Sequence, residues 1–288
     1  MNGIINVYKP KDCTSQHVVS AVRKFLHTKD VGHMGTLDPQ GEGVLPIGVG
    51  KSTRLFDLML KKDKVYEARF KFGYETDTLD KDGTITEYAL KVPSKAEITS
   101  VLPQFIGKIN QLPPKYSAKN VGGARAYDLA RKGVEFELKP SEVTIYSLDL
   151  IEDCAENEYL FRIHCSAGTY IRSLCRDIAY ATGSKATMTA IKRTRSGDFT
   201  IENALSLDEI KELGEKAIIP VEKVLEKYQR IDFPSDLYKK VSCGTSFGVD
   251  FCADQPFTVY CNGEFFGLGA IKDGIFSLKT YLRDDKID

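Results

Sequence analysis

Several stretches of the chain space apolar residues with the period of a regular element. Residues 66–72 alternate apolar and charged side chains, which predicts a half-buried strand with Tyr66 on its apolar face. Residues 159–165 alternate in the same way. Residues 14–27 and 169–183 instead space apolar residues at helical intervals, with Thr14 or Ser15 as the first cap and Gly183 as the second stop. These segments predict two strands and two helices.

Further signals extend this assignment to the rest of the chain. The opening apolar run predicts a short strand that ends at Pro10, and capping boxes at Ser94–Glu97 and Ser206–Glu209 predict two more helices. Pro103 is expected to shorten or kink the first of these. Near the end, short apolar runs separated by Asn-Gly and Asp-Gly turns predict a small all-β module of roughly sixty residues. Because strands and helices do not alternate regularly, we expect an α+β fold with a largely antiparallel sheet.

Charge is balanced over the whole chain but not along it. The 288 residues include 40 basic and 40 acidic side chains, so no global field attracts nucleic acid or membrane. Residues 161–200, however, hold seven basic and two acidic residues, and residues 108–140 hold seven basic and three acidic residues. Two such segments suggest one side that faces a polyanion. Solvated faces that bind nothing explain the charge equally well.

Cysteine usage and the absence of targeting signals indicate the compartment. Seven cysteines without a CxxC pair, and a chain without a signal peptide or an apolar run of about 18 residues, predict a soluble, unprocessed protein in the cytoplasm. Cys243, Cys252 and Cys261 are evenly spaced, but no histidine lies near them, so buried packing is favoured over zinc binding. The Gly50-Lys51-Ser52 sequence lacks the first glycine of a phosphate-binding loop, which argues against nucleoside triphosphate binding.

The segment 32–46 contains the most informative acidic residue. Asp38 lies between glycines and directly before Pro39, and proline restricts the preceding residue to extended geometry. The loop should therefore hold Asp38 rigidly. On spacing alone, an aspartate before proline is most often a turn former. A glycosidase pair formed by Asp38 and Glu42 is a second interpretation, although two acids close in sequence are weak evidence for it.

The residues GHMGTLDPQGEGVLP at 32–46 resemble the catalytic motif G-H-x-G-x-L-D-P-x-x-x-G-x-L-P of the TruB family of tRNA pseudouridine synthases. Four more segments are similar to motifs of that family in the same order: NVYKP at 6–10, KVY at 64–66, GTYIR at 168–172 and IKRTRSG at 191–197. The resemblance covers most of the first 200 residues. This chain departs from the family in Gly41-Glu42, where Ala-Thr is common, and in Ile191, where leucine is usual.

The resemblance implies an isomerase that converts uridine to pseudouridine at position 55, in the T-loop of tRNA, with no cofactor and no metal. The C1′–N1 glycosidic bond breaks, the uracil turns, and C1′ joins C5. Asp38 matches the family's nucleophilic aspartate. Attack at C6, attack at C1′ and removal of the 2′ proton all remain open as its first step. The resemblance also implies base flipping, because a stacked uridine must be extruded before the chemistry.

The family motifs assign the remaining pocket residues. Arg172 matches the arginine that pairs with the aspartate, which would favour the ionised carboxylate, while a phosphate contact is its alternative role. Tyr66 matches the tyrosine that stacks on the uracil, and Tyr170 matches a second pocket tyrosine. Ile191 falls where the family places a leucine against the base. Without the resemblance, Tyr66 would be interpreted as a core residue.

Supporting residues and the domain organisation are implied in the same way. His33 matches the histidine that holds the T-loop in its flipped-out conformation, and Lys9 and Pro10 would support the catalytic loop. Residues 1–228 would form the pseudouridine synthase catalytic domain, with an RNA-clamping insertion at 108–140, and residues 229–288 a PUA-like RNA-binding domain. The expected partner is the T stem-loop of tRNA, with no membrane and no obligate protein partner, and the expected state is a monomer.

Two alternatives compete with this assignment. One is an RNA chaperone that opens the T-loop without chemistry, and the intact set of Asp38, Tyr66, Tyr170 and Arg172 argues against it. The other is an isomerase that acts on ribosomal RNA with protein partners, and the short C-terminal module argues against that. Glu42 adds a negative charge near Asp38, which would either raise the pKa of Asp38 or point away from it.

Overall fold

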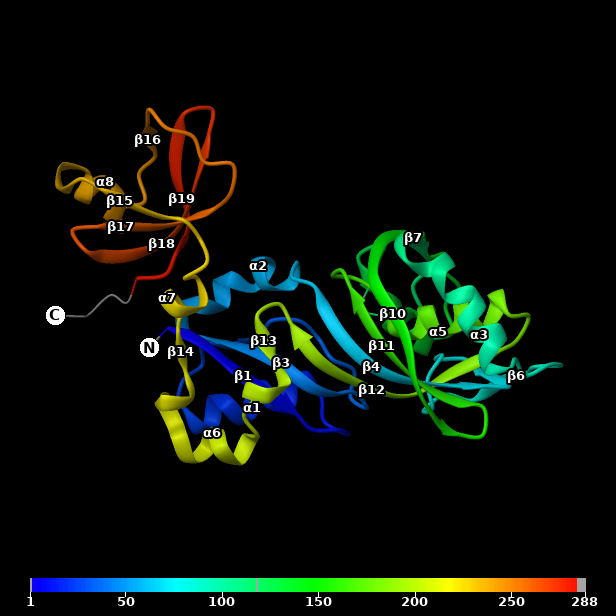
Figure 1. Ribbon diagram of the computed structural model, residues 1–288. Coiled ribbons are helices and arrows are strands. Elements are labelled where there is room, and N and C mark those ends of the chain that lie inside the picture. The colour runs from blue at the N-terminus through cyan, green and yellow to red at the C-terminus, as the bar shows by residue number, and fades with distance from the viewer. Residues whose placement is uncertain (1, 118, 284–288) are drawn as a thin grey trace.

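The computed structural model describes residues 2–117 and 119–283. Residue 118, inside the predicted insertion, and residues 284–288, at the end of the predicted C-terminal domain, lie outside the described residues. Within the described part, ten strands form one large sheet and five strands form a second, smaller sheet (Figure 1).

The large sheet runs in the order β14-β1-β3-β12-β4-β11-β10-β7, and β2 and β13 pair with β3 and β12. Its named pairs are antiparallel except for β12 with β3, which confirms the predicted α+β fold with a largely antiparallel sheet. Its strands are β1 (Gly3–Lys9), β2 (Val31–His33), β3 (Glu42–Val49), β4 (Lys64–Phe72), β7 (Gly107–Gln111), β10 (Ser141–Ala155), β11 (Glu158–Cys165), β12 (Ala186–Ser196), β13 (Phe199–Thr200) and β14 (Ile219–Pro220).

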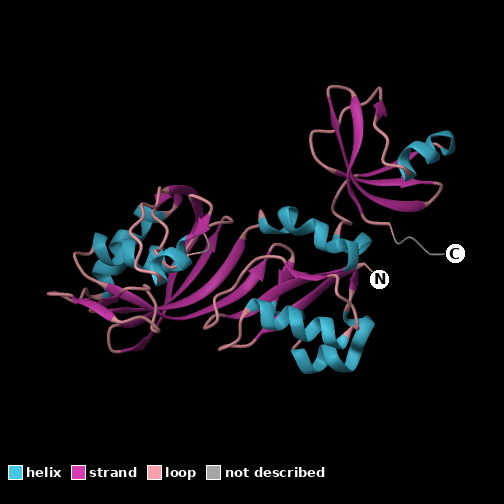
Figure 2. Ribbon diagram, turned by 180° about the vertical axis from the view of Figure 1, so that it is seen from behind, coloured by secondary structure: helices cyan, strands magenta, loops and turns pink. Residues whose placement is uncertain are grey.

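Helices cover both sides of the β1–β3 half of this sheet. Helix α1 (Ser15–Phe25) begins after Thr14, whose side chain accepts a hydrogen bond from the His17 amide, as the pattern predicts. Its predicted apolar stripe, which includes Val18 and Val22, is buried against β1, β3 and α6 (Leu207–Leu213). Helix α2 (Phe56–Leu60) lies on the other side of the same strands (Figures 1 and 2).

A second core fills the other half of the sheet. Helices α3 (Lys95–Val101) and α5 (Ile171–Ala181) pack there on β4, β10, β11 and β12. In this core, the rings of Phe70 from β4 and Phe161 from β11 stack with their centroids 4.7 Å apart. Both predicted capping boxes form. Pro103 lies in the 3₁₀ turn at Leu102–Phe105, directly after α3 ends, so the prediction that it shortens the helix is confirmed.

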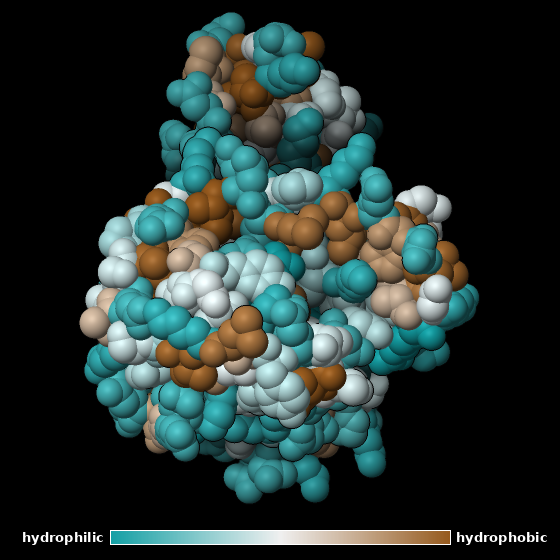
Figure 3. Space-filling view, turned by 90° about the vertical axis from the view of Figure 1, so that its right-hand side faces the viewer, coloured by the Kyte–Doolittle hydropathy of each residue, from teal (hydrophilic) through white to brown (hydrophobic). Residues whose placement is uncertain are grey.

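The C-terminal sheet forms a separate lobe, which stands above the larger body in Figure 3. Its order is β15-β17-β18-β19-β16, and the short helix α8 (Tyr238–Ser242) accompanies it, so the module is a PUA-like β fold with one helix added to the predicted strands. Both central residues of the 262–263 and 273–274 turns have positive φ, as hairpin turns of this type require. Its strands are β15 (Arg230–Phe233), β16 (Phe247–Gly248), β17 (Phe257–Cys261), β18 (Glu264–Lys272) and β19 (Ile275–Tyr281).

The two sheets share an apolar contact region. Phe265, Leu268 and Leu282 of the smaller unit pack in one buried cluster with residues of the larger unit such as Met59 and Phe199. Lys51 also donates to the Arg283 carbonyl at 2.8 Å. The remaining strands and α-helices are β5 (Tyr74–Thr76) with β6 (Ile85–Tyr88), β8 (Asn120–Val121) with β9 (Ala124–Arg125), α4 (Ala126–Arg131) and α7 (Val221–Val224).

One expectation about the cysteines was wrong. Cys243 and Cys252 are exposed, and only Cys261 of the three is buried, within β17. Cys243 lies directly after α8, and Cys252 lies in the connection before β17, so neither faces a core. All seven cysteines are free thiols, and the described residues contain no cluster of three or more His, Cys, Asp or Glu side chains suited to a metal ion.

Candidate active site

The loop that carries Asp38 connects β2 to β3 and is tied down from three sides. The Ser15 hydroxyl donates to the Leu37 carbonyl and accepts from the Leu37 amide, both at 3.0 Å. The Lys9 ammonium donates to the Pro39 carbonyl at 3.0 Å. The Arg193 guanidinium donates to the carbonyls of Gly35 and Thr36, each at 3.3 Å. Asp38 therefore projects from a short loop whose backbone is fixed on both sides of it.

Arg172 lies directly against Asp38. Its Nη2 atom is 3.1 Å from Asp38 Oδ2, and its Nη1 atom is 3.2 Å from Asp80 Oδ2. Arg172 also donates to the carbonyls of Thr78 and Tyr116, at 3.0 Å and 3.1 Å. The Arg172 side chain is 10 % exposed, whereas the Asp38 side chain is 41 % exposed. The guanidinium thus holds one carboxylate from within the protein while the other face of that carboxylate stays open to the cleft.

Asp80 is a residue of this site that sequence reasoning missed, because its segment, Thr76 to Gly83, was interpreted only as a turn. It is 7 % exposed and accepts a hydrogen bond from the Thr78 hydroxyl at 2.6 Å. Burial raises the pKa of Asp80, and the charge of Asp38 acts in the same direction, while the Thr78 hydrogen bond and the charge of Arg172 oppose them.

Asp38 opens into a cleft of about 760 Å³. Tyr66 from β4, Tyr170 at the start of α5 and Ile191 from β12 line this cleft, so the fold brings together four of the residues singled out in the sequence with Arg172. Burial raises the pKa of both tyrosine hydroxyls, which keeps them protonated at neutral pH. The cleft offers two aromatic rings and an aliphatic side chain beside the Asp38 carboxylate.

Tyr170 is held through its backbone by Gln111, a second residue that sequence reasoning missed. The Gln111 side chain accepts from the Tyr170 amide at 2.8 Å and donates to the Tyr170 carbonyl at 3.1 Å. Gln111 is the last residue of β7 and is 1 % exposed. This clamp fixes the start of α5, and with it the position of Arg172.

Lys9 is completely buried behind the loop. Its ammonium donates to the carbonyls of Pro10, Cys13 and Pro39, at 2.8, 2.6 and 3.0 Å. Burial lowers the pKa of Lys9; Cys13, Asp38 and Asp12 act in the opposite direction, and the charge of Arg193 adds to the effect of burial. Pro10 is exposed. Its carbonyl accepts a hydrogen bond from the Lys9 ammonium, which also donates to the Pro39 carbonyl of the loop.

His33 and Glu42 do not line the cleft. His33 is half-buried in β2, and its buried Nδ1 has no hydrogen-bond partner in the described part of the chain. Burial lowers the pKa of His33, so its ring is neutral at pH 7. Glu42 accepts from the Tyr8 hydroxyl at 2.8 Å and lies 3.7 Å from Lys11, so its carboxylate is directed to those two side chains.

β3 and β12 approach each other closely beside the loop. A Cβ atom at Gly43 would lie 2.3 Å from the Arg193 carbonyl oxygen, and Gly43 has a φ of 104°. Only glycine fits both conditions without strain. The short parallel pairing of Lys192 and Arg193 with Glu42 and Gly43 therefore depends on this residue.

The two basic segments differ in how much of their charge is available. Within 161–200, several cations pair with acids from elsewhere in the chain: Arg162 with Glu67, Lys185 with Glu87 and Arg195 with Asp63. Most of that surplus is therefore neutralised locally. Arg172 and Arg193 of this segment line the cleft, and Lys119, Arg125 and Arg131 from 108–140 line it as well.

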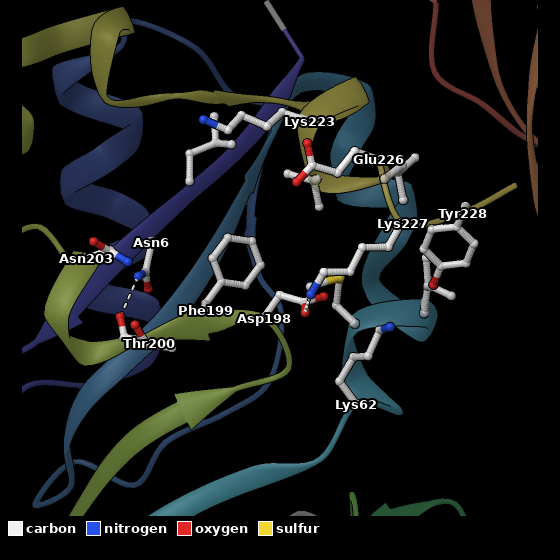
Figure 4. A pocket seen from close by; sticks show the side chains of 15 residues that line it. Asn6, Lys62, Asp198, Phe199, Thr200, Asn203, Lys223, Glu226, Lys227 and Tyr228 are labelled. Carbon is white, nitrogen blue, oxygen red and sulfur yellow. Dashed lines mark hydrogen bonds and ion pairs between the residues drawn. The ribbon is translucent and has the colours of Figure 1, made fainter. Parts of the chain in front are cut away.

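A smaller cavity, of about 250 Å³, lies between α2, β13 and the segment after α7 (Figure 4). Its lining shares no residue with the cleft, although α2 contributes to both: Phe56 and Leu60 face the cleft, and Leu58 and Met59 face the cavity. Lys227 reaches across its mouth to an ion pair with Asp198.

In the described residues, no helix is long and apolar enough to cross a membrane.

Family models cover most of the chain. Residues 23–171 match the model described as TruB family pseudouridylate synthase (N terminal domain). Residues 172–226 match the model described as tRNA pseudouridylate synthase B C-terminal domain. The boundary between the two matches falls between Ile171 and Arg172, inside the site described above.

Curated relatives are similar over nearly the whole length. The tRNA pseudouridine synthase B of Clostridium tetani (strain Massachusetts / E88) is 41 % identical over 278 residues, which covers 93 % of this chain and 95 % of the relative. The protein of the same name from Caldanaerobacter subterraneus subsp. tengcongensis is 43 % identical over 273 residues, which covers 93 % of this chain and 95 % of the relative.

Solved structures with a similar fold include chains of multi-component complexes. A chain of a Cbf5-Nop10-Gar1 complex superimposes with a TM-score of 0.71 at 26 % identity, covering 93 % of this chain and 78 % of that one. A chain of an H/ACA RNP bound to a substrate RNA containing 2′-deoxyuridine has the same TM-score at 24 % identity, covering 97 % of this chain and 84 % of that one.

Proposed function

Because this chain belongs to the TruB family of tRNA pseudouridine synthases, which convert uridine to pseudouridine in tRNA, we propose that Asp38 is the nucleophile of that isomerisation. The observation that carries the proposal is the 3.1 Å contact between Arg172 Nη2 and Asp38 Oδ2 at the edge of the cleft. The guanidinium holds one oxygen of the Asp38 carboxylate in a fixed position at the cleft, and a carboxylate is a nucleophilic group in covalent catalysis.

The proposed substrate group is the uridine at position 55 in the T-loop. A base stacked within folded RNA would not reach Asp38 at the wall of the cleft, so the uridine must be flipped out. Tyr66 would then stack on the uracil, with Tyr170 and Ile191 on the other sides of the pocket. We assign His33 to holding the flipped-out T-loop, and Lys9 and Pro10 to supporting the catalytic loop.

The chemistry requires only a rearrangement of bonds within the uridine. The C1′–N1 bond breaks, the C1′–C5 bond forms, C5 loses a proton and N1 gains one, so atoms and charge balance without a cofactor or a metal ion. Asp38 would initiate this sequence by attack at C6, by attack at C1′ or by removal of the 2′ proton. Each of these routes needs the same ionised carboxylate in contact with the flipped nucleotide.

We further propose that residues 1–228 form the catalytic domain and residues 229–288 a PUA-like RNA-binding domain. The strands of the smaller sheet, which begin at Arg230, support this division. Within the catalytic domain, 108–140 would close over the T stem-loop through Lys119, Arg125 and Arg131. The proposed working state is a cytoplasmic monomer that needs no protein partner.

The target is tested with tRNA transcripts that carry tritium at C5 of every uridine. The enzyme should release one equivalent of tritium from the natural transcript and none when position 55 is cytidine. Release from the substituted transcript would contradict the proposed target. Tight binding without release from either transcript would instead indicate an RNA chaperone, and release only from ribosomal RNA with added protein partners would indicate the ribosomal alternative.

A further inference from the structure

The cleft and the loop behind it hold four buried cations, and among the described residues only one of the four forms an ion pair with a carboxylate. Lys9, Lys64, Arg172 and Arg193 are each no more than 8 % exposed. Arg172 has its two carboxylate partners, but the other three cations donate to main-chain carbonyls and form no ion pair among the described residues. Burying a charge without a counter-ion costs free energy, so such an excess needs a functional reason.

Lys64 is the member of this group best placed to act on a substrate. It is the first residue of β4 and precedes Tyr66 by two positions, so both side chains lie on one face of the strand, and both line the cleft. Its ammonium donates to the carbonyls of Leu60 at 2.6 Å and Lys62 at 2.5 Å. An ammonium has three donors, and no third acceptor lies among the described residues, so one N–H is left.

The charged and titratable groups around Lys64 come from each neighbouring element. Arg193 faces it from β12, Cys165 is its partner on β11, and Asp63 is adjacent in the chain. Burial lowers the pKa of Lys64 to about 8; the charge of Arg193 adds to this effect, while Cys165 and Asp63 act in the opposite direction. The Asp63 carboxylate is bonded to Arg195 and His164, so it is not a dedicated counter-ion for Lys64.

We propose that the ammonium of Lys64, reinforced by Arg193, stabilises the negative charge that uracil acquires while the C1′–N1 bond is broken. The electron pair of that bond leaves with the base and spreads over N1, O2 and O4. When C5 then bonds to C1′, the C5 proton departs and N1 takes up a proton, while Lys64 keeps its own proton throughout. Fixed charges in a closed site stabilise such a species more than water does. This inference rests on the proposed function of the cleft.

Three chains with different charge at position 64 give three different pH profiles. In the wild type, the rate should fall as pH rises through about 8, because the neutral amine no longer stabilises the base. Lys64→Arg stays protonated, so that fall should disappear between pH 7 and about pH 9.5. Lys64→Met should be slower at pH 7 by about tenfold or more and should also lack the fall. If the role of Lys64 were purely structural, its substitution would change the melting temperature without changing the pH dependence of the rate.

The measurement is single-turnover tritium release from saturating enzyme and full-length tRNA, from about pH 6.5 to about pH 9.5. Lys62→Met is the matched control, because Lys62 is only two positions away but does not line the cleft, and it should keep the wild-type profile. A Lys64→Arg profile that still falls near pH 8, or full activity of Lys64→Met at pH 7, would overturn the inference. If neither variant folds, a wild-type rate that stays constant across this range overturns it alone. Absence of release by the wild type at every pH would contradict the proposed function instead.

Discussion

Arg172 and Asp80 form a buried ion pair, with 3.2 Å between Arg172 Nη1 and Asp80 Oδ2, although 92 residues separate them along the chain. The Asp80 side chain is 9 % exposed and the Arg172 side chain 10 %. A guanidinium presents its donors in a rigid plane, so a carboxylate that fixes one nitrogen also fixes the direction of the other. Asp80 therefore orients the Nη2 atom that contacts Asp38.

Replacing Asp80 by asparagine should slow the isomerisation while leaving tRNA binding nearly intact. The amide would keep the shape of the side chain but remove the charge that fixes Arg172, so we expect the single-turnover rate to fall by about 10- to 100-fold. The dissociation constant for tRNA should change by less than about threefold, because the Asp80 side chain is only 9 % exposed and is paired with Arg172. Rapid-quench tritium release and filter binding measure the two quantities.

Asp177→Asn is the matched control for this substitution. Asp177 also pairs with an arginine, Arg176, at 2.8 Å, but that pair does not reach Asp38. Its rate should stay within about twofold of the wild type, as for a pair outside the site. Equal losses in the two variants would mean that Asp80 acts through general stability and not through Arg172.

Arg193→Lys should impair both stability and catalysis. Arg193 donates to Val44 at 2.7 Å as well as to the catalytic loop, and one lysine ammonium cannot reach all three carbonyls from that position. Leaving buried carbonyls without donors should lower the free energy of unfolding by about 2–4 kcal/mol. Urea unfolding measures this change. Arg162→Lys, at an exposed pair with Glu67, should cost less than about 1 kcal/mol, and an equally small loss for Arg193→Lys would contradict the role assigned to it.

Charge reversal in the insertion should weaken tRNA binding in a salt-dependent way. Lys119 and Arg131 line the cleft, so the double variant Lys119→Glu, Arg131→Glu should bind tRNA more weakly and flatten the plot of log K against log salt by about 0.7–0.9 per lost phosphate contact. Lys211→Glu, on the exposed side of α6, provides the control. An unchanged slope in the double variant would remove these residues from the RNA interface.

The strands that could not be predicted from the sequence are those in which apolar and polar residues do not alternate. β3 contains Pro46 and two glycines, which are poor strand residues. Pro46 nevertheless pairs with Asn6 of β1, and Gly43 permits the close approach of β12. β12 contains the sequence Lys-Arg-Thr-Arg, which is typical of a solvated surface. Arg193 is nevertheless buried, because main-chain carbonyls distant in sequence accept its hydrogen bonds.

The residues of the site divide in the same way. Motifs identified Asp38, Tyr66, Tyr170, Arg172 and Ile191, and the fold brings these five to one cleft. Asp80 and Gln111 escaped because their partners, Arg172 and Tyr170, lie 92 and 59 residues away, and no local pattern encodes such a contact. The sequence shows that the Thr76–Gly83 turn contains Asp80, but it does not show that Asp80 lies opposite Arg172.

The most direct test of the central claim is single-turnover isomerisation by Asp38→Asn, compared with Asp82→Asn. Both aspartates line the cleft, but only Asp38 of the two contacts Arg172 in the described structure. We predict that Asp38→Asn binds tRNA within about threefold of the wild type and loses at least about a thousandfold in rate, as expected for removal of a nucleophile, while Asp82→Asn remains active. A rate for Asp38→Asn above about a tenth of the wild-type rate would contradict the assignment of Asp38 as the nucleophile.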